Sequence, residues 1–144
     1  MSSKKQVEQV RTMRERTTRL DRAGDYWTEE EKEMVRAQTA DYRAMQDLVL
    51  EGDLFRVGNI SDNAFAFVLV AKDKSRARMV CYRRMGRPSN EIIRLKMAGL
   101  DPTKQYYVKE LGLILGGRTL CNVGIVPKFP RGDFATAVYT FEEK

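Results

Sequence analysis

The chemistry open to this chain is limited first by a side chain that it lacks. The sequence contains no histidine. Catalytic Ser-His-Asp and Cys-His pairs, and zinc sites with histidine ligands, are therefore excluded. Two cysteines are present, Cys81 and Cys121. Free cysteine behaves as a small core hydrophobe, so we expect both to be reduced thiols buried on strands.

Carboxylates are the next candidates, because two of them held about 5 Å apart can act as nucleophile and general acid/base. The chain has 20 acidic residues, so a chance pair is easy to find. Five aspartates fall in segments that resemble turns, where the side chain accepts hydrogen bonds from nearby backbone amides. They are Asp53, Asp62, Asp73, Asp101 and Asp133. We expect these aspartates to form turns, and we assign no catalytic residue.

Aromatic rings offer a different chemistry, since their faces stack on the apolar faces of sugars as well as on other side chains. The candidates for such a platform are Trp27, Tyr106, Tyr107 and Tyr139. Packing in a core or between domains is the interpretation that we favour for these four residues. A carbohydrate-binding surface stays open as the alternative.

No glycine-rich loop of the phosphate-binding kind is expected. Such a loop leads from a strand into a helix, and neither Gly86 nor the pair Gly116-Gly117 follows a predicted strand into a predicted helix. We therefore predict no nucleotide or other cofactor, and no metal site.

The composition is that of one ordinary domain. The 144 residues are 42% hydrophobic and 32% charged, enough for one main core. No apolar run approaches the roughly 20 residues of a membrane-spanning helix. A polar stretch follows Lys4 and Lys5 where a secretory signal would be apolar. We expect no membrane association and a cytoplasmic location.

The basic charge raises nucleic acid as a partner, because basic surfaces attract phosphate. The net charge is +6 and the isoelectric point is near 9.4. The excess charge is divided between the N-terminal segment and the solvent faces of predicted strands, without the interleaved aromatic residues of a single-strand binder. Nucleic acid is therefore disfavoured as a partner.

Two helices are predicted before the β region. Residues 4–20 place apolar side chains at helical spacing and predict a first helix. A second helix begins at Thr28, where Thr28 and Glu31 form a capping box, and extends to about Leu50. Its apolar stripe needs a partner surface and is the candidate partner-facing site. The stripe consists of Met34, Val35, Tyr42, Met45 and Val49.

After Gly52 the pattern changes to the two-residue alternation of strands. We place the domain boundary there, which gives a helical segment over residues 1–52 and a β domain over residues 53–144. The predicted fold is mainly β, an antiparallel β-sandwich preceded by one or two α-helices. The expected strands are residues 54–57, 64–72, 77–85, 91–99, 106–111, a segment within 113–123, and 134–141.

The strand that begins at Ala64 is predicted to be central, because it is apolar on both faces. Phe65, Phe67 and Leu69 would lie on one side, with Ala66, Val68 and Val70 on the other. The strand predicted over residues 91–99 alternates apolar and basic residues, which is typical of a strand with one wet face.

Several short motifs follow one another from residue 28 onward. The first three begin at Thr28 (Thr-Glu-Glu-Glu-Lys), Glu51 (Glu-Gly-Asp-Leu-Phe-Arg-Val) and Val70 (Val-Ala-Lys-Asp-Lys-Ser). The later ones are Tyr82-Arg83-Arg84-Met85, Leu95 to Pro102, Gly117 to Gly124, and Gly132-Asp133-Phe134 with Tyr139. Their order over residues 28–143 resembles the C-terminal region of the family-36 glycoside hydrolases, the large α-galactosidases. The sequence departs from that family at Phe134-Ala135-Thr136, where the final strand of the family is more polar.

This resemblance implies that the helix from Thr28 corresponds to the last helix of a (β/α)8 catalytic barrel, with the β domain as the C-terminal sandwich beside it. The sugar site of the family precedes this region, so the resemblance carries no catalytic residue onto this chain, and the chain alone is expected to be inactive. The implied role is a non-catalytic accessory domain, and the parent reaction is hydrolysis of terminal α-galactosides in carbohydrate metabolism.

Two other functions stay open: a carbohydrate-binding module and, more weakly, a basic nucleic-acid-binding protein. For the accessory domain, the expected partner is the missing barrel or a second copy of the chain in a homodimer.

Overall fold

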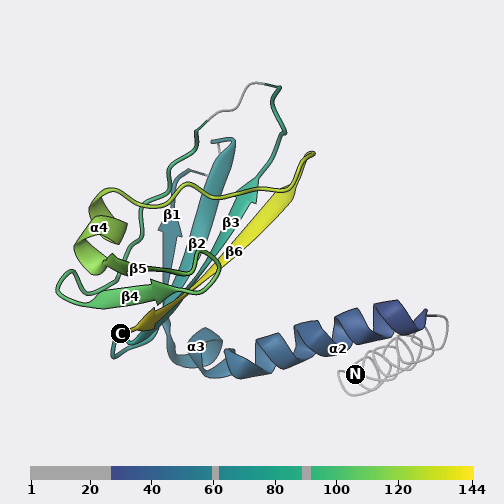
Figure 1. The fold of residues 1–144 in the computed structure, drawn as a ribbon, viewed down its shortest axis with the longest axis horizontal. Helices are drawn as coiled ribbons and strands as arrows, with labels where there is room; N and C mark the ends of the chain where they lie inside the picture. The colour runs from purple at the N-terminus through teal and green to yellow at the C-terminus, as the bar shows by residue number, and fades with distance from the viewer. Residues whose placement is uncertain (1–26, 60–61, 89–91) are drawn as a thin grey trace, which may run out of the picture. The chain divides into compact units, whose positions relative to one another are not determined.

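The computed structural model describes residues 27–59, 62–88 and 92–144. The chain divides into two compact units, Met1–Met45 and Gln46–Lys144. Figure 1 labels the helices and strands of both units. The helix predicted over residues 4–20 lies outside the described residues. In the described part of the chain, no helix is long and apolar enough to cross a membrane.

The first unit contains the described helix α2 (Glu29–Ala44). The capping box predicted at Thr28 is confirmed. The Thr28 hydroxyl accepts a hydrogen bond from the Glu31 amide at 3.2 Å, and the Thr28 amide donates to Glu31 Oε2 at 2.8 Å. Three glutamates in the first turn complement the positive end of the helix dipole. The helix therefore begins where the sequence predicts.

The end predicted for this helix, near Leu50, is wrong. Met45 leaves the helical conformation (φ −120°, ψ 12°), and a separate short helix, α3 (Gln46–Glu51), follows it. In α3, Leu48 is buried. The second compact unit therefore begins at Gln46 and includes α3, whereas the sequence pattern placed the boundary after Gly52.

The second unit is built on one six-stranded sheet in the order β1-β2-β3-β6-β4-β5, with every neighbouring pair antiparallel (Figure 1). The C-terminal strand lies between β3 and β4, so it joins the two halves of the sheet. The strands are β1 (Asp53–Val57), β2 (Ala64–Val70), β3 (Arg76–Arg83), β4 (Gln105–Val108), β5 (Leu113–Gly116) and β6 (Ala135–Glu143).

The register of the strands gives the sheet an inner and an outer face. Val68 lies opposite Met79, and both are fully buried on the inner face. Phe67 lies opposite Val80, and both are only half-buried on the outer face. Alternate residues of a strand point to opposite faces. This pairing therefore assigns every second residue of each strand to the inner face and the residues between them to the outer face. β2 is therefore apolar on both sides, as predicted, but only its inner side belongs to the core.

A second layer covers the inner face and completes a mainly β fold, which confirms the predicted fold class. The layer comes from residues 95–100, from the short helix α4 (Gly117–Asn122) and from residues near Ile125. Its buried side chains pack against the inner face of the sheet. They are Leu95, Met97, Leu100, Leu120 and Ile125.

The strand predicted over residues 91–99 is wrong. In its described part, residues 92–99, only Leu95 pairs, in an isolated antiparallel bridge with Ile125. Gly124 permits this bridge because a Cβ atom there would lie 2.2 Å from the Leu95 carbonyl oxygen. The segment thus meets a loop residue instead of a neighbouring strand.

The strand predicted within residues 113–123 is right only up to Gly116, after which α4 begins. The pair Gly116-Gly117 therefore does lead from a strand into a helix, contrary to the prediction. Gly117 is needed for packing, because a Cβ atom there would lie 1.9 Å from the Asp101 carbonyl oxygen. Its amide donates to the Lys104 carbonyl oxygen at 2.8 Å. Gly117 thus permits the close contact between α4 and the loop that precedes β4.

Candidate functional site

The apolar stripe predicted on the second helix is divided between two elements. Met34, Val35 and Tyr42 lie on α2 and are 60%, 37% and 47% exposed. Met45 forms the cap that ends α2, and Val49 lies on α3 in the second unit. No residue of α2 is buried. The three α2 residues are therefore exposed apolar side chains on one helix, and Val49 does not continue that helix.

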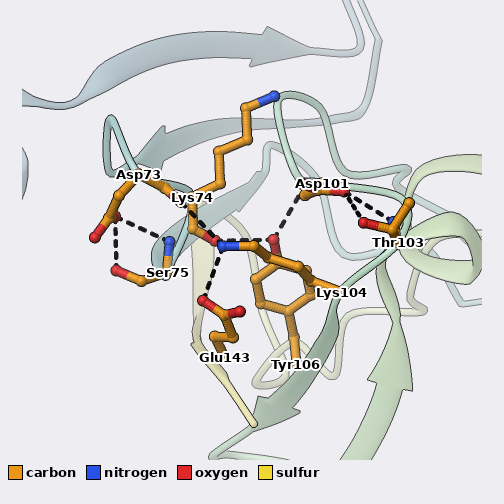
Figure 2. A network of polar contacts seen from close by, with 8 residues as sticks. All are labelled: Asp73, Lys74, Ser75, Asp101, Thr103, Lys104, Tyr106 and Glu143. Carbon is orange, nitrogen blue, oxygen red and sulfur yellow. Dashed lines mark hydrogen bonds and ion pairs between the residues drawn. The ribbon is translucent and has the colours of Figure 1, made fainter.

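A polar network joins three distant segments of the sheet unit, and Figure 2 shows its side chains. The Tyr106 hydroxyl donates to the Lys74 carbonyl oxygen at 2.9 Å and accepts from the Asp101 amide at 3.1 Å. Lys104 Nζ donates to the Asp73 carbonyl oxygen at 3.1 Å and to the Glu143 carboxylate at 2.9 Å. These bonds connect the β2–β3 turn, the loop before β4 and the end of β6.

Two aspartates of this network form tight local turns (Figure 2). Asp73 Oδ1 accepts from the Ser75 hydroxyl at 2.7 Å and from the Ser75 amide at 3.0 Å. Asp101 Oδ1 accepts from the Thr103 hydroxyl at 2.6 Å and from the Thr103 amide at 2.9 Å. The hydroxyl bond, followed by the amide bond, lowers the pKa of each carboxyl group. The lysine of the network changes in the opposite sense, since its bond to Glu143 raises the pKa of Lys104.

These pKa shifts bear on what the network can do chemically. A general acid at neutral pH is a carboxyl group whose pKa is raised, and a lysine base is one whose pKa is lowered. Asp73, Asp101 and Lys104 all shift in the other direction. Their charges are held fixed in hydrogen bonds, so the network is suited to bracing the fold.

The turn role predicted for the aspartates is confirmed for Asp62 as well, which accepts from the Asn59 amide at 3.0 Å. Asp133 also accepts from a backbone amide, but that of the distant Gly86, at 2.8 Å. Asp53 differs, because it begins β1 and forms an ion pair with Lys72. Four of the five candidate carboxylates thus bind backbone amides.

The four aromatic residues considered as a sugar platform are not available as one. Tyr106 and Tyr139 are buried in the core. The Tyr106 hydroxyl belongs to the polar network, and the Tyr139 hydroxyl accepts from the Lys128 amide at 2.8 Å. Tyr107 is half-buried, and Trp27 belongs to the other unit. The interpretation of these rings as packing residues is confirmed for the two buried tyrosines.

A different aromatic group, which the sequence analysis missed, lies on the outer face of the sheet. Phe65 and Tyr82 stack with ring centroids 5.3 Å apart, and Phe67 meets both rings edge-on at 5.9 Å. The Arg56 guanidinium lies 5.8 Å from the Phe67 centroid. The sequence places Phe65 and Phe67 on one side of a predicted central strand, but it does not show that this side lies outside the core.

The two cysteines are free thiols. Cys81 is fully buried on β3, and burial raises its pKa to about 12. Cys121 is half-buried on α4, and burial also raises the pKa of that thiol. The prediction of buried thiols on strands is right for Cys81 and wrong for Cys121, which is only half-buried and lies on a helix. Raised pKa values leave little thiolate at neutral pH, which disfavours a nucleophilic role.

The described part of the sheet unit has a hollow beside the end of β1 and another beside α3. One lies between the end of β1 and residues 92–96 and carries Arg87, Arg94 and Lys96 together with Asp62. The other lies beside α3, where Asp47 forms an ion pair with Arg76. Neither hollow has an aromatic side chain among its lining residues. In the described part of the chain, no cluster of cysteine and acidic side chains could hold a metal ion.

Comparison with known sequences places this chain beside one family. Residues 64–141 match the model described as "Glycosyl hydrolase family 36 C-terminal domain". Alpha-galactosidase Mel36A of Lactobacillus acidophilus is 29% identical over 115 residues, which is 80% of this chain and 16% of that protein. Alpha-galactosidase AgaA of Geobacillus stearothermophilus is 28% identical over 113 residues, which is 78% of this chain and 15% of that protein.

Comparison with solved structures gives the same result. The crystal structure of the GH36 α-galactosidase AgaB from Geobacillus stearothermophilus superposes with a TM-score of 0.78 at 28% identity. The match covers 83% of this chain and 17% of the AgaB chain. The galactosidase domain of the α-galactosidase–sucrose kinase AgaSK has the same TM-score at 22% identity, which is a likeness of fold. This chain therefore spans about one sixth of the length of these relatives.

Proposed function

Because this chain belongs to the glycosyl hydrolase family 36 C-terminal domain family, we propose that it is a non-catalytic accessory domain of an α-galactosidase-like enzyme. It acts by packing against the catalytic region of that enzyme. The proposal rests on one observation above all. The family match falls entirely on the sheet unit, and the relatives extend far beyond the part that this chain matches.

The chemistry of the sheet unit supports a structural role. Four of the five aspartates that stand out in the sequence bind backbone amides, and the pKa values of Asp73 and Asp101 are lowered. A retaining glycosidase needs one carboxylate as nucleophile and a second, protonated one as acid. Side chains whose oxygens are already engaged in turn bonds are poorly placed for either task.

The partner is proposed to be a catalytic barrel, in keeping with the exposed apolar residues of α2 and with the exposed Leu54 on the outer sheet face. Apolar surfaces that remain exposed on a domain commonly mark contacts with other proteins. The hydrolysis of terminal α-galactosides is proposed as the reaction of the assembled enzyme. This chain would contribute stability to that enzyme and no reacting group.

The test uses the Lactobacillus acidophilus α-galactosidase Mel36A, truncated before the part that matches this chain. We expect the purified chain to bind this catalytic region in a sedimentation experiment and to raise its melting temperature. The Mel36A segment that was removed is the positive control. A catalytic region that binds its own segment but neither binds this chain nor gains stability from it would contradict the proposal.

A further inference from the structure

One end of the sheet brings together segments from distant parts of the chain. β1 and β3 end there and β2 and β6 begin there, since Ala64 pairs with Arg83 and Arg83 pairs with Ala135 (Figure 1). The connecting segments at this end are residues 58–59, 62–63, 84–88 and 131–134. Residues 92–96 lie beside them, because they line one hollow together with Arg87. We call these described segments the basic tip.

The basic tip exposes large apolar side chains. Phe134 is 84% exposed and Ile92 is 76% exposed, which are the two highest values among the exposed large hydrophobic residues of the described chain. Met85 is 61% exposed. A single exposed hydrophobic residue is ordinary, but several gathered at one end of a domain indicate a contact surface.

The backbone that carries two of these residues is held in place by hydrogen bonds. The Asn63 side chain accepts from the Met85 amide at 3.0 Å and donates to the Met85 carbonyl oxygen at 3.1 Å. The Phe134 amide donates to the Arg84 carbonyl oxygen at 2.8 Å. Phe134 nevertheless has a φ angle of 53°, which is unfavourable for a bulky side chain. Strain that the surrounding structure maintains is typical of binding sites, so we interpret Phe134 as positioned for a contact.

Basic side chains accompany the apolar ones. The cationic residues of the basic tip are all exposed, and they are Arg84, Arg87, Arg94, Lys96 and Arg131. The carboxylates in the same segments are those of Asp62 and Asp133. Asp62 accepts from the Asn59 amide at 3.0 Å, and Asp133 accepts from the Gly86 amide at 2.8 Å. The described part of the tip therefore has an excess of positive charge.

This combination of side chains matches the surface of an anionic lipid bilayer. Apolar side chains enter the boundary between headgroups and acyl chains, while arginine and lysine are attracted to negatively charged headgroups. A single-stranded nucleic acid would attract the same charges, but its bases stack on aromatic rings, and Ile92 and Met85 have none. The expectation of no membrane association was drawn from the lack of a spanning segment and of a secretory signal, and contact with a membrane surface requires neither.

We propose that the basic tip is a site for peripheral binding to anionic membrane surfaces. Phe134, Ile92 and Met85 enter the interface of the bilayer, and the basic residues lie against the headgroups. This inference goes beyond the proposed function and does not depend on it, because it involves no catalytic region.

The experiment measures the fraction of the full chain that sediments with sucrose-loaded vesicles as the lipid concentration is raised. The vesicles contain one part phosphatidylserine to three parts phosphatidylcholine, and vesicles of phosphatidylcholine alone are the comparison. We expect binding to the mixed vesicles that is at least about tenfold tighter than binding to phosphatidylcholine alone. Binding to the mixed vesicles should weaken as salt is added, because salt screens the attraction between the charges.

Two variants separate the apolar contribution from the electrostatic one. Phe134→Gly removes the ring and should weaken binding to the mixed vesicles about tenfold or more. The melting temperature of this variant should not fall, because glycine adopts a positive φ without strain, so unfolding cannot explain the loss. Arg94→Gln removes one charge and should weaken binding about fivefold at low salt.

Each variant has a matched control elsewhere on the sheet unit. Leu113 is 53% exposed on β5, the edge strand opposite β1, so Leu113→Ser should leave the affinity for vesicles unchanged. Lys109 is exposed and follows β4. Lys109→Gln removes the same charge as Arg94→Gln and should change the affinity less.

Three outcomes would overturn the assignment. If the chain binds neither kind of vesicle, or binds both equally, it has no site for an anionic surface. If Phe134→Gly weakens binding no more than Leu113→Ser does, the site is not at the basic tip. If a single-stranded oligonucleotide binds more tightly than the mixed vesicles and Phe134→Gly leaves that binding intact, the partner is a nucleic acid. None of these results concerns binding to the truncated Mel36A catalytic region, so failure here is distinguishable from failure of the proposed function.

Discussion

The helix α2 and the sheet differ in the interactions that stabilise them. α2 begins at a capping box and carries an acidic first turn, yet none of its residues is buried. The strands of the sheet surround a core in which Val68, Met79 and Phe141 are fully buried. Local hydrogen bonds can fix where a helix begins, but most of the stability of a helix in a protein comes from packing. The two regions should therefore differ in stability, with the sheet more stable than α2.

The largest difference in the free energy of unfolding is expected when one apolar side chain is removed from the sheet core and one from α2. Phe141→Ala leaves a cavity at a fully buried position and should cost about 3 to 5 kcal/mol in the free energy of unfolding. Tyr42→Ala on α2 removes a ring that is 47% exposed and should change that free energy by about 0.5 kcal/mol or less. Urea unfolding followed by circular dichroism measures both. Equal losses would show that α2 is packed as firmly as the core.

The next test asks whether α2 mediates a homodimer, in which a second copy of the chain covers its exposed apolar residues. Burying a large apolar side chain contributes about 1.5 to 3 kcal/mol. If α2 mediates a dimer, replacing Val35 and Tyr42 together with lysine should convert the dimer to a monomer in sedimentation equilibrium. A chain that is monomeric at high concentration before any substitution would contradict self-association through α2.

Within the sheet unit, the hydroxyl of Tyr106 is expected to have a moderate effect. It is bonded at 2.9 Å to the Lys74 carbonyl oxygen and at 3.1 Å to the Asp101 amide. Tyr106→Phe leaves these groups without that partner and should cost about 1 to 3 kcal/mol. Tyr107→Phe, at the adjacent half-buried position, is the control and should be close to neutral in the same unfolding measurement. A neutral Tyr106→Phe would show that the polar network does not brace the fold.

The capping box gives a smaller and more local effect. Thr28→Ala removes the hydroxyl that accepts from the Glu31 amide, and the loss of such a cap costs about 1 kcal/mol. Since α2 lies outside the core of the sheet, this cost should appear as faster amide exchange in the first turns of α2. Exchange in β2 and β3 should stay unchanged. Faster exchange throughout the sheet would mean that the two regions unfold as one cooperative unit.

The smallest effects are expected from pH, because the groups concerned are at the surface. The pKa of Asp73 and that of Asp101 are lowered from 3.8 in the folded protein, so their contribution to stability is present above pH 3.8. It is lost as the pH falls through the lower folded values. The pKa of Lys104 is raised from 10.5, so its contribution is present below that pH and is lost as the pH rises through the higher folded value.

Melting temperatures measured across both pH ranges test these two directions. Asp73→Asn and Lys104→Met are the variants for the acid and alkaline ranges. Each variant should reduce the pH dependence of the melting temperature within its own pH range. A profile that keeps its slope in both variants would mean that other groups are responsible.

The parts of this fold that follow from local chemistry were predictable from the sequence. Thr28 and Glu31 specify the start of α2 through their own hydrogen bonds, and Asp73 and Asp101 form turns with residues two positions away. A continuous apolar run predicted β2, and the two-residue alternation predicted β3. In each case the determining contacts lie within a few residues or follow from a regular repeat.

The remaining errors concern segments whose structure depends on distant residues. Residues 92–99 alternate like a strand, but Leu95 meets Ile125 in the second layer instead of a neighbouring strand. Gly117 enters α4 because the Asp101 carbonyl oxygen occupies the space of a side chain. The outer aromatic cluster was not predicted, because alternation does not show which faces of a sheet are covered. These outcomes depend on tertiary contacts that a single sequence does not display.

The most direct test of the central claim is an initial-rate assay of aryl α-galactoside hydrolysis with three samples: the chain alone, the truncated Mel36A catalytic region alone, and both together. The account predicts no product above the blank from the chain alone. It also predicts that the catalytic region keeps more activity after heating when the chain is present. Product released by the chain alone, and abolished by replacing one of its aspartates, would contradict the conclusion that this is a non-catalytic accessory domain.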